Sequence, residues 1–270
     1  MAFLLGILAG VHTSSWGMYK DAPHEGFTVP KYLRSVIVAA ILAIVLQRLL
    51  DFQLATWADA AVFFGVVYAA ERLTLELWKS FIREEDQSKY FIPMQFGVLG
   101  KPIRSRAVRW SILGAIVVVL IASVWFVVWL QRTYPDLPPW LVILTIGSLG
   151  GWYSAFGGAW KDAPVEGFET FKFFRSPGIA IFWSAVMAFL TTNWIYLALA
   201  GIGYTVATIE TYKTFFFPNK PRGKFAGKPV RYPGILEQRK YVAVLYAGIW
   251  TIMIAMLLLA FLGQRQGMLP

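Results

Sequence analysis

One charged motif occurs twice in the chain. Residues 20–27 read Lys-Asp-Ala-Pro-His-Glu-Gly-Phe, and residues 161–168 read Lys-Asp-Ala-Pro-Val-Glu-Gly-Phe. The match continues downstream at the same offset of 141, so that ten of the sixteen positions from 20 to 35 are identical. Such a match predicts a fold built from two copies of one unit, with shared function where the copies agree.

The composition is that of a membrane protein. Hydrophobic residues make up 57% of the 270 positions and charged residues only 15%, which is too apolar for an ordinary soluble domain. The 12 Trp and 12 Tyr suit the aromatic belts at a bilayer interface. We expect an all-α, polytopic protein of the cell membrane. Because the start Met-Ala-Phe-Leu-Leu lacks the basic lead of a secretory signal, we expect the first stretch to remain as a helix.

The apolar stretches predict eight membrane spans. A span needs about 20 residues of helix, and eight stretches come near that length: 2–19, 35–50, 57–81, 108–131, 139–160, 177–194, 195–216 and 241–263. Four spans per copy give parallel repeats, since an even number returns the chain to its starting side. The predicted halves are residues 1–132 and 140–270, joined by an external linker at 133–139.

The positive charges are unevenly distributed between the predicted connections. Of 25 Lys and Arg, 21 lie in or beside connections 1–2, 3–4, 5–6 and 7–8, whereas Arg48, Arg132 and Arg265 fall on the other side and Arg72 within a span. The positive-inside rule then places those four connections in the cytoplasm and both termini outside. The net charge of +10 has two interpretations, this topological bias or an anionic ligand.

The repeated motif brings acidic and basic residues together at the membrane surface, and we expect it to be a loop. Two cations three residues apart share one face at the start of the following helix, where unpaired N–H groups also attract phosphate. Alternatively, ion pairs within the loop neutralise the set. The candidate ligand-binding residues here are Lys20, Asp21, Glu25, Lys31, Arg34, Lys161, Asp162, Glu166, Lys172 and Arg175.

A second basic loop is also repeated. The sequence Gly100-Lys-Pro-Ile-Arg104 matches Gly227-Lys-Pro-Val-Arg231. Lysine on such a turn is suited to phosphate, but the glycine-rich frame of a nucleotide-binding loop is absent. Non-specific binding of anionic lipid is the other interpretation. The candidate residues are Lys101, Arg104, Lys228 and Arg231.

Charges inside predicted spans mark a further candidate region. Glu76 and Lys79 match Glu210 and Lys213 in the last turns before the cytoplasm, where each pair lowers the cost of approaching hydrocarbon. Glu71 and Arg72 lie deeper and have uncharged counterparts, Thr205 and Val206. This asymmetry suits one working site rather than two, and we expect Glu71 and Arg72 to form a buried pair.

Repeated glycines predict close helix packing. Gly6, Gly10 and Gly17 match three glycines of the second copy, at 147, 151 and 158. Small residues four and seven apart let helices approach closely in lipid, so we expect these two helices near the pseudo-twofold axis.

The absence of cysteine and the scarcity of histidine exclude several kinds of site. The chain has no Cys and only two His, His12 and His24, neither of them repeated. Disulfides, iron–sulfur clusters, cysteine nucleophiles and histidine-rich metal sites are therefore excluded. Nucleic acid is not an expected partner, because the basic loops are short and follow membrane topology. Anionic membrane lipids are expected partners, and a homo-oligomer or a larger membrane complex is possible.

Three functions remain open. The first is a transporter, flippase or channel that binds a phosphate-bearing lipid or small anion at the cytoplasmic face, without a cofactor. The second is an integral-membrane enzyme acting on a lipid phosphate or diphosphate, with Mg²⁺ held by the acidic residues at 21, 25, 162 and 166. The third is a structural subunit of a membrane complex. A charged cleft between the halves favours the first two, and a sealed interface favours the third.

Overall fold

The computed structural model describes residues 1–218 and 225–270, except for the side chains of Lys89 and Val165. The described chain is almost entirely helical. Its elements are α1 (Ala2–Glu25), α2 (Val29–Leu49), α3 (Trp57–Leu77), η1 (Trp78–Ile82), η2 (Gln87–Lys89), β1 (Gly97–Val98), β2 (Lys101–Pro102), α4 (Arg106–Thr133), α5 (Pro139–Val142), η3 (Ile143–Gly147), α6 (Leu149–Glu166), α7 (Thr170–Met187), α8 (Trp194–Phe215) and α9 (Gly234–Leu262). The strands β1 and β2 form a small antiparallel hairpin that pairs Gly97 with Pro102 and Val98 with Lys101.

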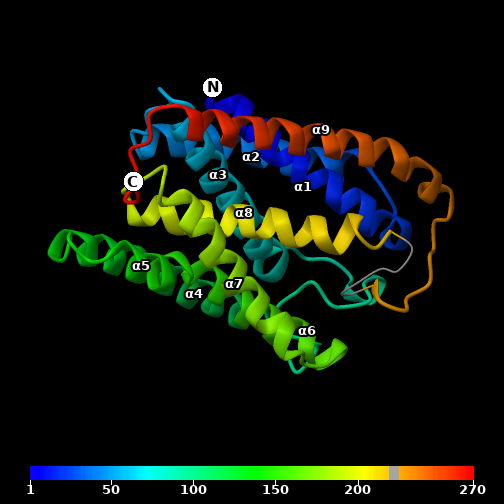
Figure 1. The fold of residues 1–270 in the computed structure, drawn as a ribbon. Coiled ribbons are helices and arrows are strands. Elements are labelled where there is room, and N and C mark those ends of the chain that lie inside the picture. The colour runs from blue at the N-terminus through cyan, green and yellow to red at the C-terminus, as the bar shows by residue number, and fades with distance from the viewer. Residues whose placement is uncertain (219–224) are drawn as a thin grey trace.

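Two interior helices organise the molecule. α8 runs through the middle, between α1, α2 and α9 on one side and α4 to α6 on the other (Figure 1). It packs against α3, where a Cβ added to Gly65 would lie 2.8 Å from the Cα of Ala200. Only glycine allows the two backbones to come this close. Fully buried aromatic side chains, including Phe64 and Tyr204, fill the space around this contact.

Polar side chains fix where the interior helices begin. Thr56 and Asp59 form a capping box at the start of α3, with each side chain bonded to the other's backbone N–H. Asn193 caps α8 by accepting a hydrogen bond from the backbone N–H of Tyr196. α7 ends at Met187 and α8 begins at Trp194, close to the predicted division between 177–194 and 195–216.

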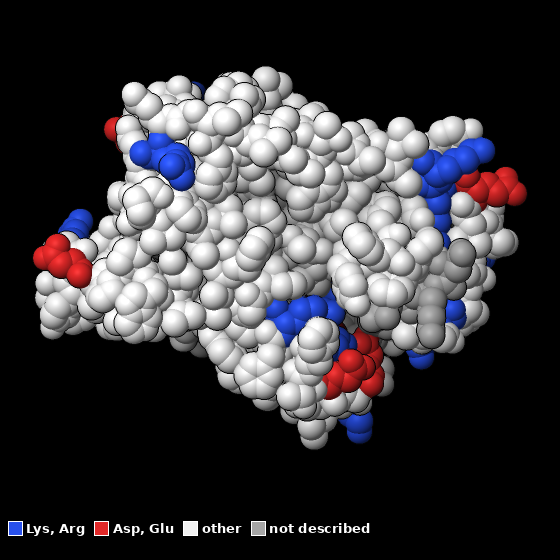
Figure 2. All heavy atoms as spheres, viewed as in Figure 1, with Lys and Arg blue, Asp and Glu red and all other residues white. Residues whose placement is uncertain are grey.

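Four helical segments are long and apolar enough to cross a membrane. They are α2, α4, the continuous segment Pro139–Pro164 and α9. Their outer faces are rich in exposed hydrophobic side chains, such as Val118 and Trp125 of α4. Charged side chains gather at the left end and at the lower centre and right, with a broad uncharged belt between them (Figure 2). The chain therefore has the character of a membrane protein.

The repeated motif is helical, and the expectation of a loop is wrong. α1 and α6 continue through the motif to Glu25 and Glu166, with a proline inside the last turn of each. Gly26 and Gly167 then end the helices at φ +80 and +85, values that glycine adopts without strain. In the first copy, Thr28 caps α2, which begins at 29 instead of the predicted 35. The motif is thus a helix end followed by a short turn.

The glycine strips bring consecutive helices together. Gly6 lies against Ala39, Ala40 and Ala43 of α2, and a Cβ at Gly151 would lie 2.6 Å from the Cα of Pro177 in α7. Gly6, Gly10 and Gly151 thus pack on the next helix in the chain, and the placement of these two helices near a pseudo-twofold axis stays a prediction. The central close contact belongs to α3 and α8.

Candidate functional site

A cavity of about 740 Å³ lies between the two halves of the chain. Its walls come from α3, α4, α6 and α8, with the first turns of α7 and the β1–β2 hairpin at one end. Polar and charged side chains line the end near the repeated motif, and the rest of the wall is mainly apolar. Seven of the predicted site residues line it: Arg72, Glu76, Lys161, Asp162, Lys172, Arg175 and Glu210.

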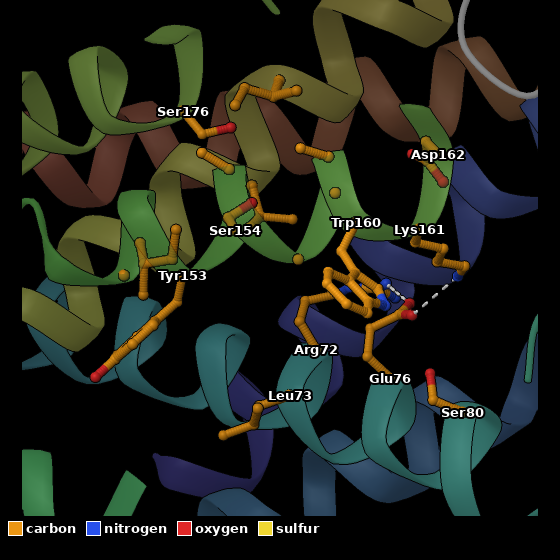
Figure 3. A pocket seen from close by; sticks show the side chains of 18 of the residues that line it. Arg72, Leu73, Glu76, Ser80, Tyr153, Ser154, Trp160, Lys161, Asp162 and Ser176 are labelled. Atoms are coloured by element: carbon orange, nitrogen blue, oxygen red, sulfur yellow. Dashed lines mark hydrogen bonds and ion pairs between the residues drawn. The ribbon is translucent and has the colours of Figure 1, made fainter. Parts of the chain in front are cut away.

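Glu76 is the centre of the charged end. Arg72 and Lys79 of its own helix region both reach its Oε1, with the Lys79 Nζ at 3.2 Å. Lys161 approaches Oε2 from α6, at 3.8 Å. Figure 3 shows Arg72 and Lys161 pointing toward Glu76 from two different helices. The repeated motif of the second copy is therefore joined to a helix of the first.

Glu210 has a corresponding arrangement. The Nζ of Lys20 lies 2.6 Å from its Oε2, and that of Lys213 lies 3.1 Å from its Oε1. Lys20 and Lys161 hold matching places in the repeated motif, and each pairs with a glutamate from the opposite half. Within one copy of the motif, Lys172 pairs with Glu166, as the alternative of neutralisation inside the motif predicts.

The apolar part of the cavity extends along α4. Ile116, Leu120 and Val124 of that helix face the cavity, opposite residues of α6 and α8. A hydrogen bond of 2.6 Å between the hydroxyls of Ser123 and Tyr153 joins α4 to α6 midway along. A ligand that matches this wall has a charged group at one end and hydrocarbon at the other.

Residues of the first motif lie elsewhere. Lys31 is exposed at the start of α2, and the Arg34 guanidinium stacks on Trp78 at 5.0 Å. Asp21 and Glu25 are half-buried near the end of α1 and have partners of their own. The structure thus gives the two copies different surroundings, although their sequences match.

The two copies of the second basic loop cover helix ends. Their candidate cations, Lys101, Arg104, Lys228 and Arg231, are not among the residues that line the cavity. Lys101 and Arg104 are exposed beside the hairpin. In the other half, the Arg231 guanidinium and the Lys228 ammonium lie over Phe91, at 4.5 and 5.8 Å. The backbone N–H of Arg231 also donates to the carbonyl of Pro23 at 2.9 Å, which closes this loop over the end of α1.

The predicted pair between Glu71 and Arg72 is not formed. Arg72 pairs with Glu76 one turn further along and stacks on Trp16 at 5.1 Å. Glu71 is fully buried, and within the described part of the chain its carboxylate accepts no hydrogen bond. Successive residues of a helix point about 100° apart, so neighbouring side chains do not face each other, whereas residues four apart such as Arg72 and Glu76 do.

The connection between η1 and α4 is fixed by one buried arginine. Arg109 is 1% exposed, and its guanidinium donates to the carbonyls of Phe81 and Ile103 and pairs with Glu84. In the same connection, burial and a hydrogen bond to Glu85 raise the pKa of Tyr90 to about 12. These contacts position the hairpin that covers one end of the cavity.

The acidic residues do not gather into a metal site. Among residues 1–218 and 225–270, no group of three His, Asp or Glu side chains is placed to hold an ion. The glutamates at 76, 166 and 210 are each paired with lysine. Asp162, which lines the cavity, is the remaining carboxylate of interest for the Mg²⁺ alternative.

Sequence reasoning missed the residues that create the space. Tyr153, Gly157 and Ser123 line the cavity and carry no charge, so neither charge nor identity within the repeat singled them out. A signal was present, because Gly157 stands where the first copy has Trp16. Positions at which the copies differ in size would have pointed to the cavity.

Comparison with models of protein families, with curated protein sequences and with solved structures finds no match for this chain.

Proposed function

We propose that the chain is a multi-pass protein of two tandem four-helix halves, with eight spans and both termini outside the cell. α1, α3, α7 and α8 have 24, 21, 18 and 22 residues, which at about 1.5 Å per residue is near a bilayer's thickness. Both termini and the α4–α5 connection lie at one end of the molecule, and both copies of the motif lie toward the other (Figure 1).

We further propose that this protein is a transporter, flippase or channel for a phosphate-bearing lipid or small anion. The observation that carries this proposal is the cavity between the halves, with its charged end and its apolar wall along α4. The charged end of this space has more cations than carboxylates, which suits a molecule with a negative group; it is lined by Arg72, Lys161, Lys172, Arg175 and Lys213 and by Glu76, Asp162, Glu169 and Glu210. The same charged space makes a purely structural subunit the weaker alternative.

Lys161 is the best placed cation for a phosphate. Its distance of 3.8 Å from Glu76 exceeds the 2.6 Å between Lys20 and Glu210. Glu76 keeps Arg72 and Lys79 as partners if Lys161 turns to a ligand. A bound phosphate would therefore gain one charge-assisted contact without leaving the half-buried Glu76 unpaired.

An enzyme acting on a lipid phosphate is the second candidate. Asp162 favours it, because this carboxylate lines the cavity next to Lys161 and makes no hydrogen bond or close ion pair with the residues that the structure describes. Mg²⁺ needs few protein carboxylates and keeps several waters. A dependence of ligand binding on Mg²⁺ that disappears in Asp162→Asn would favour the enzyme.

Matching lysines of the two copies provide the test. Lys172 lines the cavity, whereas Lys31 holds the same place in the first motif and is exposed outside it. In vesicles that contain the purified protein, we expect movement of labelled phosphatidylglycerol or of phosphate. Lys172→Ala should slow this movement about tenfold, a loss of about 1.4 kcal/mol, and Lys31→Ala should leave it unchanged. The proposal is wrong if neither probe moves, or if both variants behave alike.

A further inference from the structure

The side of the molecule opposite the cavity is filled by aromatic rings. The Nδ1 of His12 shares a hydrogen bond of 3.0 Å with the Tyr68 hydroxyl, and the indole N–H of Trp16 donates to the same hydroxyl at 3.1 Å. From α9, Tyr246 and Trp250 pack their rings on His12, with centroids 4.5 and 5.6 Å away. These five rings close the space between α1, α3 and α9.

The corresponding positions on the cavity side are small. At the offset of 141 between the motifs, Trp16 corresponds to Gly157. At the offset of 127 between Lys101 and Lys228, Trp250 corresponds to Ser123. Both small residues line the cavity, and a Cβ added to Gly157 would meet no atom within 4 Å. Two missing indole rings therefore account for an open space on one side and a closed one on the other.

The open space continues along α4 toward the other end of the molecule. A second cavity of about 390 Å³ lies between α4 and the α5–η3 segment, and it is lined almost entirely by apolar side chains. Ser123 and Leu149 belong to the walls of both cavities. The two cavities are therefore adjacent at these residues, beside the hydrogen bond between the hydroxyls of Ser123 and Tyr153. Together they flank α4 from its charged end to the neighbourhood of Leu137 and Leu141.

We infer that this groove along α4 holds a phosphate-bearing lipid, with the phosphate at the Lys161 end and the acyl chain against α4, and that the aromatic side holds none. The inference rests on the proposed function and narrows its ligand from lipid or anion to lipid. Apolar walls of this length stabilise an acyl chain, at about 0.8 kcal/mol for each buried CH₂. A small inorganic anion would have to give up its hydration against hydrocarbon there.

Tryptophan substitutions that copy the closed side test the inference. We would titrate the full-length protein in detergent with dioleoyl phosphatidylglycerol and measure the dissociation constant. Gly157→Trp and Ser123→Trp should each raise it about tenfold or more, because the indole takes the space of the chain. Gly114→Trp is the matched control, since Gly114 lies on the exposed face of α4 with open space around it. It should bind like the wild type. Circular dichroism and gel filtration establish that each variant is folded.

Two competitors identify what the site recognises. Inorganic phosphate should not displace the bound lipid at millimolar concentration, and dioleoylglycerol, which lacks the phosphate, should bind at least about tenfold more weakly. Wild-type affinity in both Gly157→Trp and Ser123→Trp would overturn the inference. So would displacement by inorganic phosphate, which would identify an anion site.

Vesicle measurements separate this inference from the proposed function. If phosphatidylglycerol binds in the groove but is not moved between leaflets, the transport proposal fails and the lipid site stands. If lipid is moved equally well by wild type and by Gly157→Trp, transport stands and the groove is not its site. Loss of both binding and movement in Gly157→Trp, with both retained in Gly114→Trp, supports the two together.

Discussion

Glu210 forms ion pairs with two lysines, Lys213 of its own helix and Lys20, which lies 190 residues earlier in the chain. Its side chain and that of Lys20 are each only 14% exposed, so both charges depend on the pair for stabilisation. Sequence reasoning identified both residues as repeated charges. It could not identify the pairing, because a motif that carries its own glutamate offers a nearer partner.

Replacement of this carboxylate should destabilise the fold. Glu210→Gln leaves Lys20 and Lys213 without a counter-charge in a mostly buried place, and we expect a loss of about 3 kcal/mol. Thermal unfolding in detergent measures it. The exposed Glu237→Gln is the control and should shift the stability by less than about 0.5 kcal/mol. The double variant Lys20→Met/Glu210→Gln should be more stable than Glu210→Gln; a further additive loss would contradict the pairing.

At the level of helices, the glycine pattern predicted close packing but could not choose the partner. Gly151 fits against Ser176, Pro177 and Ala180, and Gly10 fits in the same way against Ser35 and Val36. These contacts join consecutive helices across a short turn. The spacing of glycines within one helix specifies which face of that helix packs closely. The partner helix depends on the turn at Gly26 or Gly167, and the sequence did not predict that α1 and α6 continue as helices up to these glycines.

Leucine at a packed glycine should separate the two helices. A Cβ at Gly151 would already lie 2.7 Å from the Cβ of Ala180 and 2.8 Å from the carbonyl oxygen of Ser176. We expect Gly151→Leu to reduce stability by about 1–3 kcal/mol through overpacking, seen as a lower midpoint of thermal unfolding. Gly248→Leu, on α9 with open space around the glycine, should have little effect. Equal effects of the two substitutions would contradict this packing.

For the molecule as a whole, helices lie at the eight predicted stretches in the predicted order, and four of the helical segments are long and apolar enough to cross a membrane, but the predicted ends differ from the observed ones. Helix ends here are set by polar residues such as Thr28, Asn193 and Ser105, which hydropathy does not register. The cavity could not be predicted from the sequence for a different reason. It lies at positions where the copies differ in size, such as Trp16 and Gly157, and identical positions carry no sign of that difference.

Membrane topology can be tested with introduced cysteines, because the chain has none. With both termini outside, a membrane-impermeant maleimide applied to intact cells should label Asp136→Cys, in the connection between α4 and α5. It should label Lys101→Cys, on the hairpin, only after the membrane is opened. Labelling of both sites in intact cells would be incompatible with the proposed orientation, and reversed labelling would invert it.

The crossed contacts of Lys20 with Glu210 and of Lys161 with Glu76 bear on how such a protein is assembled in a cell. While the second half is still being synthesised, Glu76 already has Arg72 and Lys79 of its own helix region as partners, but Lys20 lacks the glutamate that it contacts in the finished protein. Completion of the chain then supplies Glu210 as the counter-charge of Lys20, so a truncated product would carry a lysine without this partner, suited to recognition by membrane quality control.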